Sequence, residues 1–169
     1  MALIVEDGTG VPGANTYVSR AAFIVYAADR GITIANDANA DALLYKAMDY
    51  LLLFEGRWKG VRTSSTQSLA WARKQVYLDN VLFPDNEIPA QLVRAQAELG
   101  LQVQSGINLL PTLSGQTAFV TREKVDVIET EYSEAIALQL LGSLPDMPLV
   151  EALLAPLFGA PNRLRTLRI

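Results

Sequence analysis

The residues with the most distinctive chemistry lie in FEGRWKGVRTSSTQSLAWARKQV, residues 54–76, which hold both tryptophans and, from Arg57 onward, five basic residues and no acidic one. Aromatic rings that stack on bases, together with cations that hold phosphates, form the sites of proteins that bind single strands. Yet Trp58 and Trp71 are thirteen residues apart, with a polar loop between them. We therefore favour packing over base stacking and expect Trp71 to anchor the core. Trp58 is expected at the rim of a subunit contact, with its ring beneath Arg57 and Lys59.

Two acidic stretches are the next candidates for chemistry. In EDGTG, residues 6–10, two glycines follow two carboxylates, but neither a Walker lysine nor a dinucleotide pattern comes after them, so a turn is expected. Glu129 and Glu131 share one face of an expected strand, with Glu134 nearby, which could suit a hard cation. Because no further ligands follow at a defined spacing, a solvated face or a charged contact is favoured over a metal site.

Two residue types are missing, and their absence excludes most catalytic sites. The chain has no cysteine, so it has no disulfide, no thiolate metal site and no cysteine nucleophile. It has no histidine either, which removes the usual proton carrier near neutral pH and the commonest metal ligand. Catalysis by paired carboxylates remains the one alternative. We expect no catalytic residue, no cofactor and no metal, and a protein that is not an enzyme.

Composition indicates a globular protein of one domain, with or without an appendage. Half of the 169 residues are apolar and 19% are charged, and the formal net charge is −4. The basic residues gather in residues 57–78 and in the last eleven residues. A general DNA-binding protein needs many cations on one face, so this distribution fits docking by charge complementarity better. The apolar content is high enough to favour buried contact with other chains.

Targeting signals are not expected. The first residues have no basic segment and only four apolar residues before Glu6, which does not fit a signal peptide. No run approaches the roughly 20 apolar residues of a membrane span. The sequence therefore predicts a protein without membrane partners, made in the cytoplasm.

Three helices should position these residues. A first helix is expected from a Ser19 cap to Arg30, and a second through residues 44–51, whose apolar residues recur at helical spacing, with Gly56 as its end. A third follows Pro89 as far as residue 105. Together they predict a mainly α fold built on a small helical bundle. Between the second and third helices, SLAWARKQV is expected to form two helical turns.

The C-terminal third is expected to contain a β-ribbon, a last helix and an extended arm, and not a further part of the three-helix bundle. Alternation from Phe119 predicts a β-ribbon over residues 119–132, with a slip in phase near Asp126. Because a lone hairpin is marginal in water, the ribbon must pack on the bundle or pair with a neighbouring chain. A last helix begins near Asp146 and is shortened by Pro156. An extended arm follows, which we expect to be mobile until a partner orders it.

The expected elements divide the chain into two parts. Residues 1–142 are expected to form the bundle domain, including the ribbon. Residues 143–169 are expected to form the C-terminal helix and its arginine-containing arm.

Several segments in order carry a family resemblance: EDGTGVPGANTYVS, KAMDYLL, FEGRWKGVR, QSLAWARKQV, EIPAQLVRAQAELGL, EKVDVIETEY and ALLAPLF. Over about residues 5–158 the chain resembles the small head–tail connector (adaptor, or head-completion) proteins of long-tailed bacteriophages. That family is often labelled DnaT-like single-stranded-DNA-binding. Ala72 stands where the family often has proline, and this change favours a helix through Trp71. Asp126 stands where the family often has glycine.

The resemblance implies a structural role in the virion neck. Such proteins form a ring, usually a dodecamer, on the portal, and they complete the head after packaging. Their partners would be further copies of this chain, the portal protein and the next neck or tail-completion protein. Genomic double-stranded DNA would pass through the lumen without sequence-specific binding. Before assembly the chain would be in the host cytoplasm. The alternative is a single-stranded-DNA-binding replication or priming factor.

The resemblance and the charge pattern together suggest contact residues. Three arginines of the arm are candidates for the portal: Arg163, Arg165 and Arg168. Eight residues are candidates for the subunit or neck interface: Arg57, Trp58, Lys59, Val125, Val127, Glu129, Glu131 and Tyr132.

Overall fold

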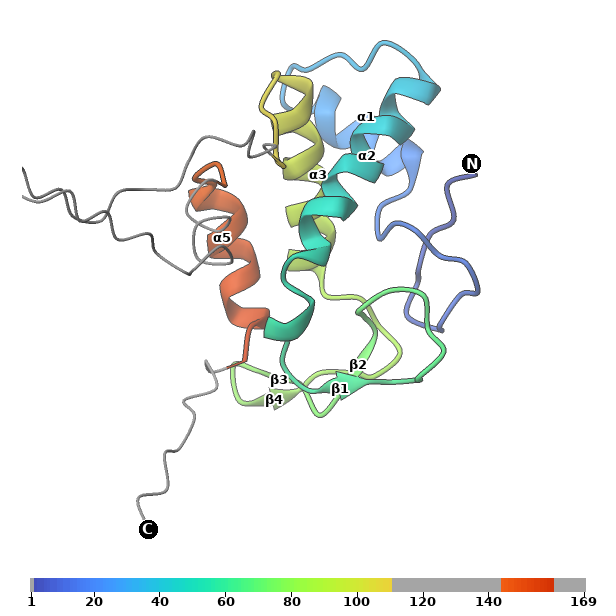
Figure 1. Ribbon diagram of the computed structural model, residues 1–169, viewed down its shortest axis with the longest axis vertical. Coiled ribbons are helices and arrows are strands. Elements are labelled where there is room, and N and C mark those ends of the chain that lie inside the picture. The colour runs from blue at the N-terminus through green and yellow to red at the C-terminus, as the bar shows by residue number, and fades with distance from the viewer. Residues whose placement is uncertain (1, 111–143, 160–169) are drawn as a thin grey trace, which may run out of the picture. The chain divides into compact units, whose positions relative to one another are not determined.

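The structure is a computed structural model, and it describes residues 2–110 and 144–159 (Figure 1). Residues 2–107 and 147–159 belong to one compact unit. Its helices are α1 (Arg20–Ala28), α2 (Asp37–Leu52), α3 (Ala90–Gln104) and α5 (Pro148–Leu154). Two short 3-10 segments span Glu55–Arg57 and Ala155–Leu157. The strands are β1 (Val61–Arg62), β2 (Arg73–Lys74), β3 (Tyr77–Leu78) and β4 (Val81–Leu82).

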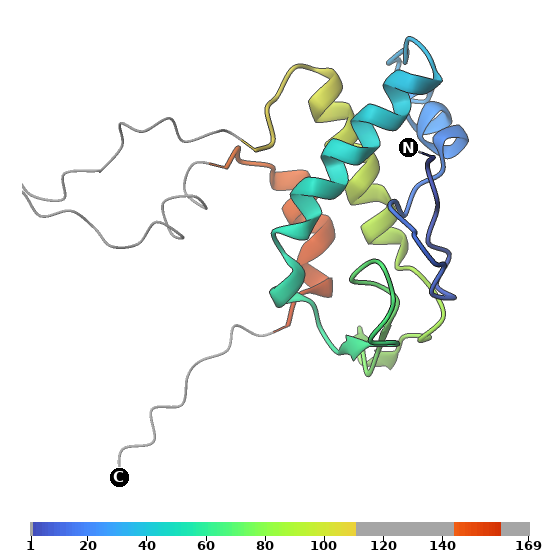
Figure 2. The same ribbon diagram turned by 45° about the vertical axis from the view of Figure 1, so that its right-hand side comes forward.

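The expected mainly helical fold is confirmed for these residues. Figure 1 shows α5 alongside α3, and Figure 2 shows α2 crossing α3. Helix α3 contacts each of the other three helices. Its inward residues Leu92, Ala95 and Leu99 are completely buried, as their spacing predicts. Gly100 also faces inward, because a Cβ there would lie 2.8 Å from the ring of Phe23 on α1.

The first two helices begin at side-chain caps. The Ser19 hydroxyl accepts a hydrogen bond from the backbone N–H of Ala22, which confirms the cap expected from the sequence. Asn36 caps α2 in the same way. The expected end of α2 at Gly56 is wrong, since the helix ends at Leu52. There the chain turns, so that the ring of Phe54 is buried edge-on against Tyr50, at a centroid distance of 5.3 Å.

The short strands form two antiparallel hairpins at the end of the bundle away from α1 (Figures 1 and 2). Strand β1 pairs with β2, and β3 pairs with β4, where Tyr77 lies opposite Leu82. The two residues between β3 and β4, Asp79 and Asn80, both have positive φ, at 50° and 64°. Two such residues are what a tight two-residue hairpin turn requires. This hairpin was not predicted from the sequence.

The expected helical turns over SLAWARKQV are a wrong prediction. The segment is extended, with Arg73–Lys74 in β2 and a cis peptide bond between Trp71 and Ala72. Trp71 is completely buried, and its backbone N–H donates to the hydroxyl of Tyr17 at 3.1 Å. Burial raises the pKa of this tyrosine. The tertiary contacts of these side chains outweigh a weak local preference for helix.

A buried polar network joins the N-terminal segment to the bundle. The side-chain oxygen of Gln96 on α3 accepts from the backbone N–H of Tyr17 at 2.8 Å. Its amide nitrogen donates to the hydroxyl of Thr16 at 2.8 Å and to the carbonyl of Leu44 on α2 at 3.3 Å. Because these buried polar groups pair with one another, the segment before α1 is fixed on the core rather than loose.

The last described helix is shorter than its sequence pattern, as expected from Pro156, which lies in the 3-10 segment. The helix begins at Pro148, two residues after the expected start near Asp146, and no side chain caps it. Helix α5 belongs to the same compact unit as residues 2–107. The predicted boundary at residue 142, the ribbon over 119–132 and the C-terminal arm lie outside the described residues. None of the described helices has the length and apolar character needed to span a membrane.

Candidate nucleic-acid interface

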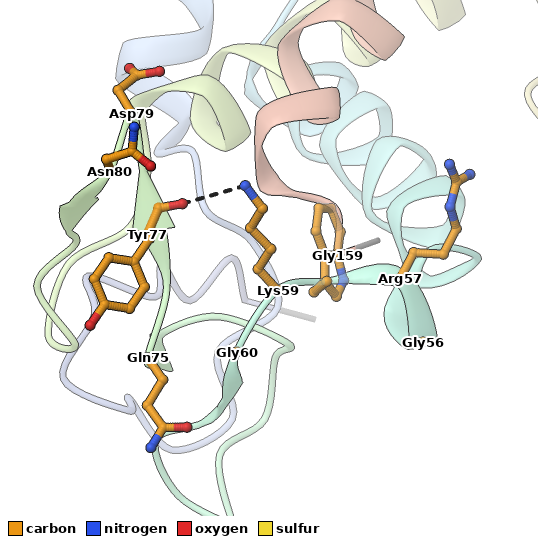
Figure 3. A pocket seen from close by; sticks show the side chains of 10 residues that line it. Gly56, Arg57, Lys59, Gly60, Gln75, Tyr77, Asp79, Asn80 and Gly159 are labelled. Carbon is orange, nitrogen blue, oxygen red and sulfur yellow. Dashed lines mark hydrogen bonds between the residues drawn. The ribbon is translucent and has the colours of Figure 1, made fainter. Parts of the chain in front are cut away.

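A surface groove of about 960 Å³ lies between the two hairpins and Gly159, the last residue that the structure describes. It is formed by the residues after α2, by the β2–β3 link, by the β3–β4 turn and by the residue after Phe158 (Figure 3). The lining residues are Gly56, Arg57, Trp58, Lys59, Gly60, Gln75, Tyr77, Asp79, Asn80 and Gly159. We call this feature the hairpin groove.

Backbone pairing fixes one wall of the hairpin groove. The N–H of Lys59 donates to the carbonyl of Leu157 at 2.9 Å, and the N–H of Gly159 donates to the carbonyl of Arg57 at 2.7 Å. Trp58 and Phe158 thus form an antiparallel bridge between segments about one hundred residues apart. The wall is therefore preformed by tertiary contact and not by a local turn.

Both tryptophans are buried. Trp71 has no exposed surface and Trp58 has 7%, and their rings meet edge-on at a centroid distance of 6.2 Å. The ring of Phe158 lies 5.0 Å from that of Trp58. The role of Trp71 as a core anchor is confirmed, and neither indole offers a free face to a base. The interface role predicted for Trp58 stays a prediction.

The basic residues of this region differ in whether their side chains have partners within the protein. Arg73 is held by its guanidinium, which donates to the carbonyls of Lys59 (2.7 Å), Gly60 (2.8 Å) and Ala70 (3.1 Å). Burial lowers its pKa. Arg62 forms an ion pair with Glu55. Arg73 is therefore held within the fold, and the charge of Arg62 is balanced by Glu55.

Three cations of this region remain at the surface. The exposed Arg57 lies over the ring of Phe158 at 4.2 Å and near that of Phe54 at 5.3 Å, not over Trp58 as expected. The half-buried Lys59 donates through Nζ to the carbonyl of Tyr77 at 3.4 Å (Figure 3). The side chain of Lys74 on β2 is exposed.

The opposite wall carries an aromatic residue that the sequence reasoning missed. Tyr77 is 57% exposed and lies in β3, while its neighbour Val76 is completely buried. Gln75, Asp79 and Asn80 line the same wall, and all three have positive φ. The signal in the sequence was YLDNVL, in which Asp-Asn between apolar residues is a hairpin turn.

The hairpin groove combines polar and charged side chains that can contact a ligand. Its lining residues include one exposed tyrosine, two amide side chains, two cations and one carboxylate. Within residues 2–110 and 144–159, no cluster of three acidic, histidine or cysteine side chains could hold a metal ion.

The N-terminal EDGTG forms a turn, as expected. The Glu6 side chain is 1% exposed, and its Oε1 accepts from the backbone N–H groups of Gly8 and Gly10, each at 2.9 Å. This carboxylate therefore stabilises its own loop. The remaining predicted contact residues lie outside the described part of the chain: Val125, Val127, Glu129, Glu131, Tyr132, Arg163, Arg165 and Arg168.

Comparison with known protein families gives a match over the whole chain. A family model described as "Putative DnaT-like ssDNA binding protein" matches residues 1–169. No curated protein and no solved structure matches the chain.

Proposed function

Because this chain belongs to the DnaT-like ssDNA-binding protein family, whose model matches residues 1–169, we propose that it binds single-stranded DNA in the hairpin groove. The observation that supports this proposal is that Tyr77, which is 57% exposed, and Lys59 both line this groove. A ring on which a base stacks, beside a cation that can reach a phosphate, is the minimal unit of single-strand binding. The protein would act by binding alone and would not be an enzyme.

The groove suits a single strand better than a duplex. Its aromatic ring needs access to a base face, which stacking and pairing hide in a duplex. Its few cations could not supply the many phosphate contacts on which duplex affinity depends. The site is therefore expected to prefer unpaired DNA.

The test is a titration of labelled oligo-dT and of a duplex of equal length, followed by fluorescence anisotropy. Tyr77→Ala should weaken oligo-dT binding by about 5- to 150-fold, because base stacking contributes roughly 1–3 kcal/mol. Val25→Ala is the control, since Val25 is 60% exposed on α1 and outside the groove. Equal binding by wild type and Tyr77→Ala would reject the groove, and a lack of binding to any single strand would reject the function.

A second candidate function is favoured by a different observation. Apolar side chains on the hairpins are exposed, with Val61 at 53%, Val81 at 68% and Leu82 at 57%. Exposed apolar residues that gather on adjacent elements are typical of contact surfaces. We propose, as the alternative, that they contact other virion proteins in a head–tail connector ring, in line with the resemblance of the sequence. Mass measurement of the protein alone and with a portal protein tests this: a species that stays monomeric in both would contradict it.

A further inference from the structure

The cations of the hairpin groove are too few to dominate binding. Of the five basic residues between residues 57 and 74, Arg62 and Arg73 are used by the fold. Arg57, Lys59 and Lys74 remain, and the carboxylate of Asp79 shares the groove with the first two. Binding to single strands that neutralises Z phosphates gives a salt slope of about −0.7Z. Two or three contacts therefore predict a slope of only about −1.4 to −2.1.

The groove also has exposed side chains that can contact a base. Gln75 and Tyr77 are exposed on either side of the buried Val76, and Asn80 is exposed in the adjoining turn. Figure 3 shows Gln75 beyond one end of β3 and Asn80 beyond the other, with Tyr77 between them. Each amide side chain offers a donor and an acceptor. The pairing edge of an unpaired base offers the matching groups, and in a duplex these are already used.

The backbone at Gln75 supports a role for its side chain. Its φ is 58°, in the left-handed region that glycine adopts readily and that a residue with a Cβ adopts at a cost. Its backbone is held by the buried Val76 on one side and by β2 on the other. Strained residues of this kind gather at functional sites. At this position glycine would fit the backbone better than the glutamine that is present.

From these observations we infer that the hairpin groove recognises unpaired bases themselves and not the phosphate backbone. This inference rests on the proposed single-strand binding and names what is recognised. Tyr77 stacks on one base, and Gln75 and Asn80, beyond the two ends of β3, form hydrogen bonds with the edges of bases along the strand. Because an amide can turn to match any of the four edges, recognition is tolerant of sequence.

The experiment compares ligands of equal length and charge on the full chain. Oligo-dT and an oligomer made of abasic sites carry the same phosphates, but only the first has bases. By fluorescence anisotropy at 50 and 200 mM salt, oligo-dT should bind at least tenfold more tightly. Its salt slope should be about −2 or shallower. Equal affinity for the two oligomers, together with a steeper slope, would overturn the inference while single-strand binding stands.

Variants separate the role of the amide from the stability of the fold. Gln75→Gly should weaken oligo-dT binding about threefold or more without lowering Tm, because glycine suits the positive φ. Tyr77→Phe should retain the preference for oligo-dT over the abasic oligomer, and Tyr77→Ala should lose it. Lys46→Ala is the control for charge, since Lys46 is exposed on α2 outside the groove. Unchanged affinity in both Gln75→Gly and Tyr77→Ala would overturn the inference.

If the wild-type protein binds neither oligomer, the proposed function fails together with the inference. If it binds oligo-dT and the duplex equally, base recognition fails alone. The two failures are therefore distinguishable in one set of titrations.

Discussion

At the scale of residues, the clearest lesson concerns the basic side chains. A count of charges in residues 57–74 suggests a phosphate-binding stretch, whereas Arg73 and Arg62 have partners within the fold. Arginine is well suited to this because its planar group has five donors and can bridge several carbonyls at once. The number of basic residues in a segment therefore overstates the number of cations that a ligand could contact.

Arg73→Ala should lower the free energy of unfolding by about 2 kcal/mol or more, because it leaves the carbonyls of Lys59, Gly60 and Ala70 without their donor. Lys74→Ala, one residue away and exposed, is the matched control and should change it by less than about 0.5 kcal/mol. Urea unfolding followed by tryptophan fluorescence measures both. Equal effects would show that the three hydrogen bonds contribute nothing.

At the scale of elements, the hairpin groove depends on the close approach of two extended segments. Gly60 has a φ of 67°, and a Cβ there would lie 2.1 Å from the carbonyl oxygen of Lys74. Only glycine satisfies both the conformation and the space, so β1 and β2 can pair directly beside it.

Gly60→Ala should therefore cost far more stability than Gly31→Ala. Gly31 has a similar φ of 72°, but no atom lies within 4 Å of its ideal Cβ position. The second variant measures the conformational strain alone, about 1 kcal/mol, and the difference between the two measures the clash. Thermal unfolding followed by circular dichroism gives the comparison. A difference in Tm of less than about 2 °C would contradict the close approach.

At the scale of the whole molecule, the described unit is completed by residues from both ends of the chain. Helix α5 packs on α3, and Leu157 and Gly159 form hydrogen bonds with the wall of the groove. The folding unit is thus not a continuous stretch of sequence, and the groove exists only when the C-terminal part is in place.

A chain that ends at Asp146 should lose cooperative unfolding, because it lacks the buried Val150, Leu154 and Leu157. Each such side chain contributes roughly 1.5–3 kcal/mol, and the sum approaches the whole stability of a typical domain. A chain that ends at Gly159 keeps every one of these contacts and is the control. Calorimetry distinguishes the two, and a cooperative transition of equal Tm in both chains would show that α5 is dispensable.

The helical core could be predicted from the order of the amino acids. Apolar spacing located α2, a serine marked the start of α1 and Pro89 marked the start of α3. The expected burial of Trp71 in the core also agrees with the structure. Such signals are local, because a helix buries the residues that recur along its own length. The absence of cysteine and histidine from the sequence also limits the chemistry that the chain can perform.

The position of the groove, and which of its side chains are free, follow from long-range contacts in the folded chain and could not be predicted from local patterns. The position of Trp71 and the bridge between Trp58 and Phe158 depend on contacts between residues far apart in sequence. Two of the three carbonyls that accept from Arg73 also lie more than ten residues away. Local propensity in a short strand is weak, so contacts of this kind set its conformation. For the same reason the exposed Tyr77, and not the two tryptophans, emerged as the ring available to a ligand.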